Sequence, residues 1–329
     1  MKPKFILHIG AGKTGTSYLQ SCFAKNFETF KSMGVLYPES GDNKAAAEGK
    51  ITSGNAVPLS LFLNHELMPQ RPRPTKEEIT AFFSNPEFKN YTSIVLSSEF
   101  IAYFDVDKMK WLAELIASQG FELKLVYYVR SIADHAVSVY SQIVKRHLYK
   151  QSFRFYIEKE YTSPFLEVIE KMHAVVGKDQ MLVLNYDVLK KQIFTHFTQN
   201  ILSCDPAAKF DDFSNQQINR SLDMYELELC RHFNQSFTQE KYSTFISDAL
   251  IYADQQKKAT FVVEPEEVEI LRGRFAVMLG KINVHLAADH QLTITSPGLK
   301  TEKRQNIILS EYEKNLVNIL SSLVRLNVK

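Results

Sequence analysis

The stretch LHIGAGKTGTSYLQ, residues 7–20, constrains the possible fold more than any other part of the chain. It begins inside the apolar run KFILHI (4–9), which is typical of a buried strand. From residue 16 onward, large apolar residues recur at helical spacing, namely Leu19, Phe23, Phe27 and Phe30. A strand, a tight glycine turn and a helix together form the opening of an α/β unit.

Strand and helix patterns alternate over the following part of the chain. Further buried strands are predicted at 93–98, 123–129 and 181–186. Helical patterns lie between them, at 107–119, 131–148 and 162–176. This alternation predicts an α/β fold with a central, mostly parallel sheet and helices on both of its faces.

Beyond residue 187, helical patterns dominate and no clear strand pattern is present. They lie near 187–202, 221–235, 265–280 and 309–327. We therefore expect one domain over residues 1–329, with a cofactor-binding α/β core (1–190) and a mostly helical cap (191–329).

Two connecting segments stand out by composition. Residues 38–60 are small, polar and rich in glycine, which predicts a long loop that serves as a functional lid or is disordered. Residues 69–75, PQRPRPT, form a proline-rich connector.

Bulk composition excludes some classes of protein. Of 329 residues, 45% are hydrophobic, and the formal net charge is only +2, which does not suggest general nucleic-acid binding. Cys22, Cys204 and Cys230 lie far apart and form no CxxC pair, so we expect buried free thiols. No apolar run approaches the roughly 18 residues of a membrane span, so we expect a soluble, cytoplasmic protein. The oligomeric state stays open.

A glycine turn between a strand and a helix is suited to binding anions, because backbone N–H groups converge beside the positive end of the helix dipole. Three classes of site share this feature. A nucleotide triphosphate loop needs G-x-x-x-x-G-K-[ST], and the position of its first glycine is Leu7, so that match fails. A dinucleotide turn needs G-x-G-x-x-G, which Gly10, Gly12 and Gly15 provide, and an acidic residue after the second strand, where Glu39 stands.

The dinucleotide interpretation leaves Lys13 unexplained. Lys13, Thr14, Thr16 and Ser17 offer one cation and three hydroxyls to a terminal anion. That combination suits an anion that is being transferred better than a pyrophosphate that is only held.

A second candidate site lies in LVYYVRSIADHAVSVYSQIVKR, residues 125–146. A predicted strand ends at Arg130, and a helix follows at once. Ligands of parallel sheets collect at the carboxyl ends of the strands, so an arginine there is a candidate binding residue. Ser138 lies on the helix, away from its apolar stripe.

These two stretches resemble the sulfotransferases that use 3′-phosphoadenosine 5′-phosphosulfate (PAPS). That family has a loop of the type K-[TS]-G-[TS]-[TS] after its first strand, and here it reads KTGTS (13–17). It also has an arginine at the end of a later strand with a serine eight residues on, matched here by Arg130 and Ser138. The resemblance covers 4–20 and 93–146 well, and 183–191 and 215–229 more loosely.

The resemblance implies a P-loop-like sulfotransferase fold and a role for each motif. Lys13 would act in catalysis by neutralising charge on the bridging and leaving oxygens, and Arg130 with Ser138 would bind the 3′-phosphate of the donor. The 5′-phosphosulfate would be held by a loop that comprises Gly12, Lys13, Thr14, Gly15, Thr16 and Ser17.

A base must accept the acceptor's proton. Glu99, in VLSSEF (95–100), follows a predicted strand, and several branches of the family that act on sugars or peptides use a glutamate in such a position. Glu99 is therefore the predicted base, with His135 and His8 as alternatives. The transfer needs no metal, and no HExxH motif is present.

The acceptor is not specified by any motif. A glutamate base favours a glycan, glycolipid or polar metabolite as the acceptor. We expect residues 38–60 and the helical cap to form the acceptor pocket. The cluster GLKTEKRQ (298–305) is either a solvated loop or a cover over the donor's phosphates, and Asn219, Arg220 and Ser221 are weaker candidates. Two other functions stay open: an NAD(P)-dependent oxidoreductase, and a non-catalytic relative that binds a nucleotide.

Overall fold

The computed structural model describes residues 2–40, 43–50, 52–64, 66, 68–211, 213, 221–254, 261–304 and 310–327. The chain divides into two compact units, each made of several segments. The first comprises Met1–Arg130, Pro164–Ile218 and Lys281–Gln291. The second comprises Ser131–Ser163, Asn219–Gly280 and Leu292–Lys329. The expectation of a single domain with a cap after residue 190 stays a prediction.

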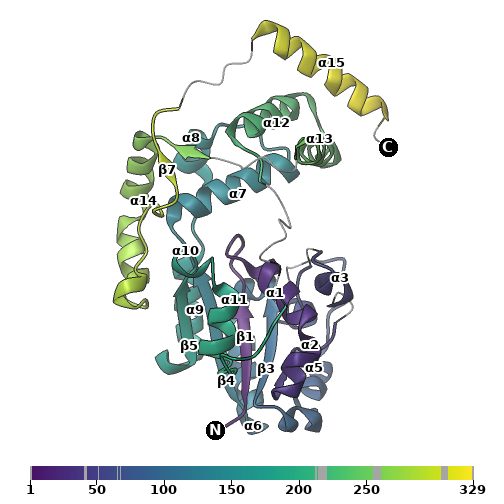
Figure 1. Ribbon diagram of the computed structural model, residues 1–329, viewed down its shortest axis with the longest axis vertical. Coiled ribbons are helices and arrows are strands. Elements are labelled where there is room, and N and C mark those ends of the chain that lie inside the picture. Colours follow the sequence, from purple (N-terminus) through teal and green to yellow (C-terminus); the bar gives the residue numbers. More distant parts are fainter. Residues whose placement is uncertain are drawn as a thin grey trace. The chain divides into compact units, whose positions relative to one another are not determined.

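The first unit contains a five-stranded sheet in the order β2-β3-β1-β4-β5. Figure 1 shows four of these strands, β3, β1, β4 and β5, side by side. All neighbouring strands are parallel. The strands are β1 (Lys4–Ile9), β2 (Val35–Leu36), β3 (Ser93–Ser98), β4 (Glu122–Val129) and β5 (Met181–Asn185). The predicted α/β class with a parallel sheet is confirmed, and so are the four strands expected from apolar runs. Within this sheet, β2 was not predicted, because its two residues are too few to show a periodicity.

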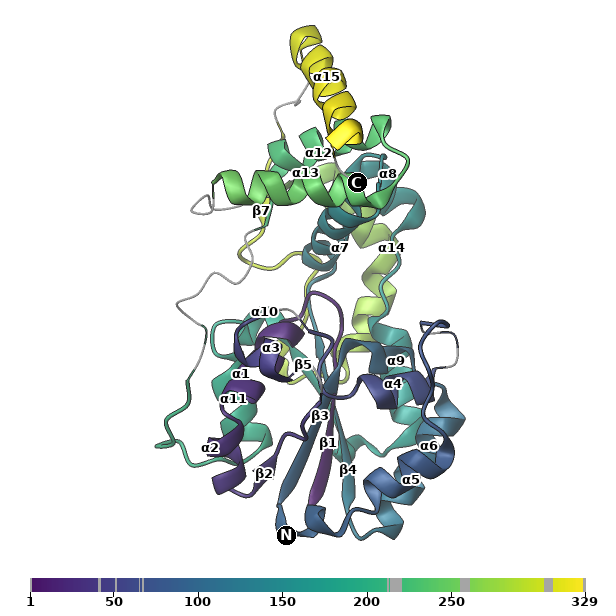
Figure 2. The ribbon, with the colours of Figure 1, turned by 90° about the vertical axis from the view of Figure 1, so that its right-hand side faces the viewer.

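Helices cover both faces of this sheet, and Figure 2 shows α1, α2 and α11 on one side with α5, α6 and α9 on the other. The helices of the first unit are α1 (Thr16–Lys25), α2 (Phe27–Ser32), α3 (Asn43–Ala47), α4 (Val57–Leu63), α5 (Lys76–Phe83), α6 (Val106–Ser118), α9 (Phe165–Val175), α10 (Tyr186–Leu189) and α11 (Ile193–His196). Short 3-10 or π-helices lie at Pro86–Asn90, Glu99–Tyr103, Lys178–Gln180, Phe197–Ile201 and Ala288–His290.

The alternation of side chains along β1 links the two helical layers. Ile6 belongs to the core that includes Phe23 of α1 and Phe194 of α11. Phe5, one residue earlier, points to the opposite face, where its ring packs against Phe83 of α5 with centroids 4.8 Å apart. Because both faces of the sheet are covered, its longer strands contain consecutive apolar residues rather than a strict alternation of apolar and polar ones. They could therefore be predicted from short apolar runs.

The second unit is mostly helical. Its helices are α7 (Ile132–Arg146), α8 (Phe153–Phe155), α12 (Met224–Ser236), α13 (Glu240–Ala253), α14 (Pro265–Asn283, whose last residues belong to the first unit) and α15 (Glu311–Asn327), with a π-helix at Tyr156–Glu160. Two short strands, β6 (Val262–Val263) and β7 (Lys300–Thr301), pair in parallel. No strand was predicted there, because two residues carry no periodicity.

Other expectations about local structure need correction. The segment 38–60 is not simply a loop, since it contains α3 and the first part of α4. The helix expected over 187–202 is divided into α10, α11 and a π-helix at Phe197–Ile201. Helix α13 was not predicted.

Cys22, Cys204 and Cys230 are buried, as expected. Within the described ranges, no helix is both long enough and apolar enough to cross a membrane.

Candidate functional site

The loop between β1 and α1 is shaped by its glycines. The Gly10 N–H donates to the carbonyl of Ser98 at a distance of 3.1 Å, which ties the loop to the end of β3. Gly15 has a φ of +79°, and a Cβ on it would lie 2.8 Å from the ring of Tyr186. Lys13 also has a positive φ, 69°. A non-glycine residue in this conformation is uncommon, and such residues gather at functional sites.

Helix α1 begins with an open N-terminus. Gly15 is its N-cap and offers no side-chain hydrogen bond, and the first turn contains no acidic residue. The first N–H groups of a helix have no partner within the helix, and the dipole makes this end positive. Gly12 and Lys13 are exposed beside it. The positive end of the helix and the Lys13 ammonium therefore lie side by side, an arrangement that suits an anion.

The two threonines of the loop have an internal role. The Thr14 hydroxyl is buried and donates to the carbonyl of Ala11 at 2.7 Å. The Thr16 hydroxyl donates to the same carbonyl at 3.4 Å. These bonds brace the turn, whereas Ser17, on the first turn of α1, is only half-buried.

Arg130 follows the end of β4 and reaches the glycine loop. Its guanidinium donates to the carbonyl of Lys13 at 2.9 Å, lies 3.5 Å from the carboxylate of Asp187, and stacks over the ring of Tyr186 at 5.3 Å. The structure thus brings together two motifs that are 117 positions apart in the sequence. Tyr186 and Asp187 were not predicted as site residues. Their position directly after β5, at the same edge of the sheet, is the signal that marks them.

Glu99 follows β3, the strand next to β1, and is half-buried. Burial raises the pKa of its carboxyl, and the positive charge of Lys13 acts in the opposite direction. The structure therefore places a carboxylate with a raised pKa within the electrostatic reach of Lys13. A carboxylate whose pKa is raised toward the operating pH is a better general base than an ordinary glutamate.

The segment before α4 is fixed to the end of β3. The Asn55 side chain donates to the carbonyls of Val95 (3.0 Å) and Pro38 (3.2 Å) and accepts from the Ser97 N–H (2.8 Å). Gly54 has a φ of +83°, and a Cβ on it would lie 2.1 Å from the Ser97 carbonyl. This part of 38–60 therefore forms a fixed wall beside the strand that carries Glu99.

The two alternative histidine bases are packed in the interior. His8 is fully buried, its Nδ1 lies 2.9 Å from the Ser97 hydroxyl, and burial lowers its pKa to about 3. His135 is buried in the second unit, where its Nδ1 lies 2.9 Å from the Tyr161 hydroxyl. Neither environment favours a base that exchanges protons with a substrate.

Ser138 lies on α7 and is half-buried. That helix belongs to the second unit, whereas Arg130 ends a segment of the first. Its role beside Arg130 stays a prediction.

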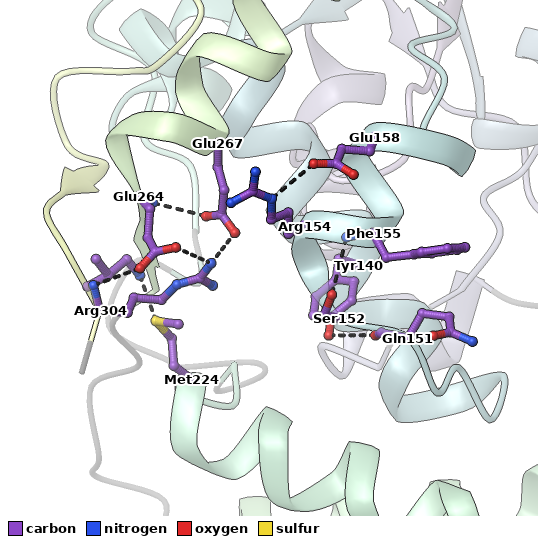
Figure 3. Close-up of polar contacts among 11 residues, drawn as sticks. Tyr140, Gln151, Ser152, Arg154, Phe155, Glu158, Met224, Glu264, Glu267 and Arg304 are labelled. Atoms are coloured by element: carbon purple, nitrogen blue, oxygen red, sulfur yellow. Dashed lines mark hydrogen bonds and ion pairs between the residues drawn. The ribbon is translucent and has the colours of Figure 1, made fainter. Parts of the chain in front are cut away.

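The basic cluster near residue 300 is partly engaged within the second unit. Arg304 forms ion pairs with Glu264, at 3.4 Å, and with the buried Glu267 (Figure 3). Lys300 and Lys303 are exposed. Arg304 is therefore engaged in ion pairs rather than fully solvated, and a role of this cluster over the donor's phosphates stays a prediction. Asn219 and Arg220 lie outside the described residues, and Ser221 is exposed.

Among the residues that the structure describes, no three His, Cys, Asp or Glu side chains are close enough together to hold a metal ion.

No protein family model matches the sequence, and no curated protein matches it. Among solved structures, the crystal structure of a sulfotransferase from Alicyclobacillus acidocaldarius is similar, with 14% sequence identity and a TM-score of 0.41. That comparison covers 77% of this chain and 97% of the other.

Proposed function

We propose that this protein is a PAPS-dependent sulfotransferase, which transfers a sulfuryl group to a hydroxyl or amine of an acceptor. One observation carries the proposal: an exposed lysine at an open helix N-terminus lies within the electrostatic reach of a glutamate and is contacted through its backbone by an arginine. These residues are Lys13, Glu99 and Arg130.

The donor would be held through its two phosphate groups. Backbone N–H groups of residues 12–17, with the Ser17 hydroxyl, would bind the 5′-phosphosulfate at the start of α1. Arg130 would form a bidentate pair with the 3′-phosphate, aided by Ser138, and would thereby select this donor over ATP, which has no 3′-phosphate. We assign Thr14 and Thr16 to bracing the loop, because both hydroxyls donate to Ala11.

For a hydroxyl acceptor, the transfer is an in-line exchange of one S–O bond for another. The acceptor oxygen bonds to sulfur while the bond from sulfur to the bridging phosphate oxygen breaks, and its electrons remain on the 5′-phosphate. Glu99 takes the acceptor's proton, and Lys13 offsets the charge that develops on the leaving oxygen. By analogy with phosphoryl transfer, positioning and electrostatics supply most of the rate.

The strand order argues against the dinucleotide alternative. In that fold, the acidic residue after the second strand reaches the ribose because the second strand lies beside the first. Here β3 lies between β2 and β1, so Glu39, after β2, is separated from the glycine turn by a whole strand. The acidic residue that closes the neighbouring strand is Glu99.

Calorimetric titration with adenosine 3′,5′-bisphosphate, ATP and NADH tests the proposal, with the wild type and Arg130→Ala. We expect selective binding of the bisphosphate. The variant should lose about 2–4 kcal/mol of binding free energy, because it loses a charge-assisted phosphate pair. Preference for NADH, or equal bisphosphate affinity in both proteins, would contradict the proposal.

The variant Glu99→Gln distinguishes an active sulfotransferase from a relative that binds the nucleotide but catalyses no transfer. On our proposal, this variant binds the bisphosphate as the wild type does but loses sulfuryl transfer. The measurement is release of the bisphosphate from PAPS in the presence of a set of alcohols.

A further inference from the structure

The first unit contains a cavity of about 590 Å³ beside the carboxyl half of β3. Its walls come from the segment after β2, the start of α4, the proline-rich connector, α5 and β3. Apolar side chains dominate, among them Leu59, Leu61, Ile79, Phe82, Phe83 and Leu96. The volume lies within the range of about 300–1,000 Å³ that is common for small-molecule sites.

Of the five polar side chains in the wall, Glu39 is exposed, and the other four are engaged with the protein itself. Ser40 donates to Asn43, and Arg73 donates to the carbonyls of Leu61 and Asn64. Glu78 accepts from the backbone of Thr75 in a capping box.

Asn55, another polar residue of the wall, bonds to the backbone of residues 38, 95 and 97. A free sugar has a hydroxyl on most of its carbons, and each one buried without a partner costs about 1–3 kcal/mol. The cavity is therefore poorly suited to a sugar and well suited to an apolar ring system.

The cavity lies close to the proposed base. Leu96 in its wall is three residues before Glu99, which is about 10 Å along an extended strand. Helix α4, which supplies Leu59 and Leu61, contacts the 3-10 helix that begins at Glu99.

We propose that this cavity binds the apolar body of the sulfuryl acceptor, and that the acceptor is an aromatic or alicyclic alcohol rather than a free sugar. This inference rests on the proposed function. It replaces the glycan or polar metabolite expected from the glutamate base, because the cavity offers apolar surface where those acceptors need hydrogen bonds.

Calorimetric titration with 2-naphthol tests the inference without any donor present, with glucose as the polar comparison. Phe82→Ala removes an aromatic ring from the cavity wall, at a residue that is 37% exposed. Pro58→Trp fills the cavity from an exposed position on its rim. Phe155→Ala is the matched control, because Phe155 is 39% exposed and lies in the second unit.

We expect 2-naphthol to bind and glucose not to bind. Phe82→Ala should weaken 2-naphthol at least fivefold, Pro58→Trp should abolish its binding, and Phe155→Ala should leave it unchanged. All three variants should keep the wild-type affinity for adenosine 3′,5′-bisphosphate, which reports that they are folded. With PAPS added, the wild type should form 2-naphthyl sulfate.

The results distinguish failure of this inference from failure of the proposed function. Bisphosphate binding without naphthol binding, or naphthol binding equal in all variants, overturns the inference and leaves the proposed function standing. Naphthol binding that depends on Phe82, without any bisphosphate binding, overturns the proposed function and with it the acceptor role.

Discussion

Gly10 and Glu99 lie so close together that a Cβ built on Gly10 would be 2.9 Å from the Cα of Glu99. The glycine loop and the proposed base are therefore fitted to each other through backbone atoms, which cannot move aside as a flexible side chain can. Gly10, the first glycine of the G-x-G-x-x-G pattern, is therefore needed for the close packing of the ends of β1 and β3. This requirement does not depend on which anion the loop binds.

Gly10→Ala should consequently destabilise the protein by about 1–3 kcal/mol, because the added methyl group overlaps Glu99 and Thr16. Gly12→Ala is the matched control, since a Cβ there meets nothing within 4 Å. Its stability should stay within about 0.5 kcal/mol of the wild type. Urea denaturation measures both, and equal stability of the two variants would rule out the proposed backbone contact.

Lys13 should act on both the rate and its pH dependence. Lys13→Met should lower kcat by about 10²–10³, because a charge beside the leaving oxygen is lost. Lys13 also lowers the pKa of Glu99, so its removal should move the acidic limb of the kcat/KM profile to higher pH. Lys13→Arg keeps the charge and should keep the position of that limb. If the acidic limb does not move in Lys13→Met, the charge of Lys13 does not influence the pKa of the base, which contradicts the proposed pairing of Lys13 with Glu99.

Glu99 should reduce stability at neutral pH. Burial raises its pKa above the ordinary value of 4.5, so the folded state disfavours the carboxylate. This penalty is absent below the ordinary pKa and complete above the raised one, and stability therefore falls as the pH rises between them. Glu99→Gln has no charge to bury, so its melting temperature should exceed that of the wild type at pH 8. The difference should vanish near pH 4.

The hydrogen bonds of Asn55 should hold the segment 38–60 to β3. Asn55→Asp can still accept from the Ser97 N–H but cannot donate to the carbonyls of Val95 and Pro38, so we expect a loss of about 1–3 kcal/mol. Proteolysis within 38–60 should become faster as well. Asn64→Ala removes a single exposed hydrogen bond, to Glu66, and serves as the control. Unchanged proteolysis in Asn55→Asp would show that other contacts hold this segment.

In the second unit, Arg304 should matter because it pairs with a carboxylate that is completely buried. Arg304→Leu leaves Glu267 without this cation and should cost about 3–5 kcal/mol of stability. Adding Glu267→Gln should recover part of the loss, since no unpaired charge then stays buried. Arg272→Leu removes an exposed pair with Glu269 and should cost less than about 1 kcal/mol. Chemical denaturation of the full chain measures all four proteins, and a small effect of Arg304→Leu would mean that Glu267 is neutral when folded.

Much of the fold could be predicted because its strands are buried on both faces. A strand such as β4 then ends in a run of apolar residues, LVYYV at 125–129, and the parallel sheet follows from the helices between such runs. The glycine loop could be predicted equally well, because the positive φ of Gly15 and the close approach of neighbouring atoms at Gly10 strongly favour glycine at these two positions. Lys13, Glu99 and Arg130 were visible for a related reason, since each lies just after a predicted strand.

The order of the strands was not contained in these local patterns. It depends on which helices pack on which face, and it decided that Glu99, rather than Glu39, belongs to the strand beside the glycine turn. Contacts between distant segments also bring Tyr186 and Asp187 to the guanidinium of Arg130, and they hold Asn55 against β3. No local pattern in the sequence predicted these contacts. The sequence by itself therefore determined the class of fold and the loop that can bind an anion. Only the tertiary structure decided which carboxylate lies within reach of that loop, because that choice is made by packing between segments far apart in the chain.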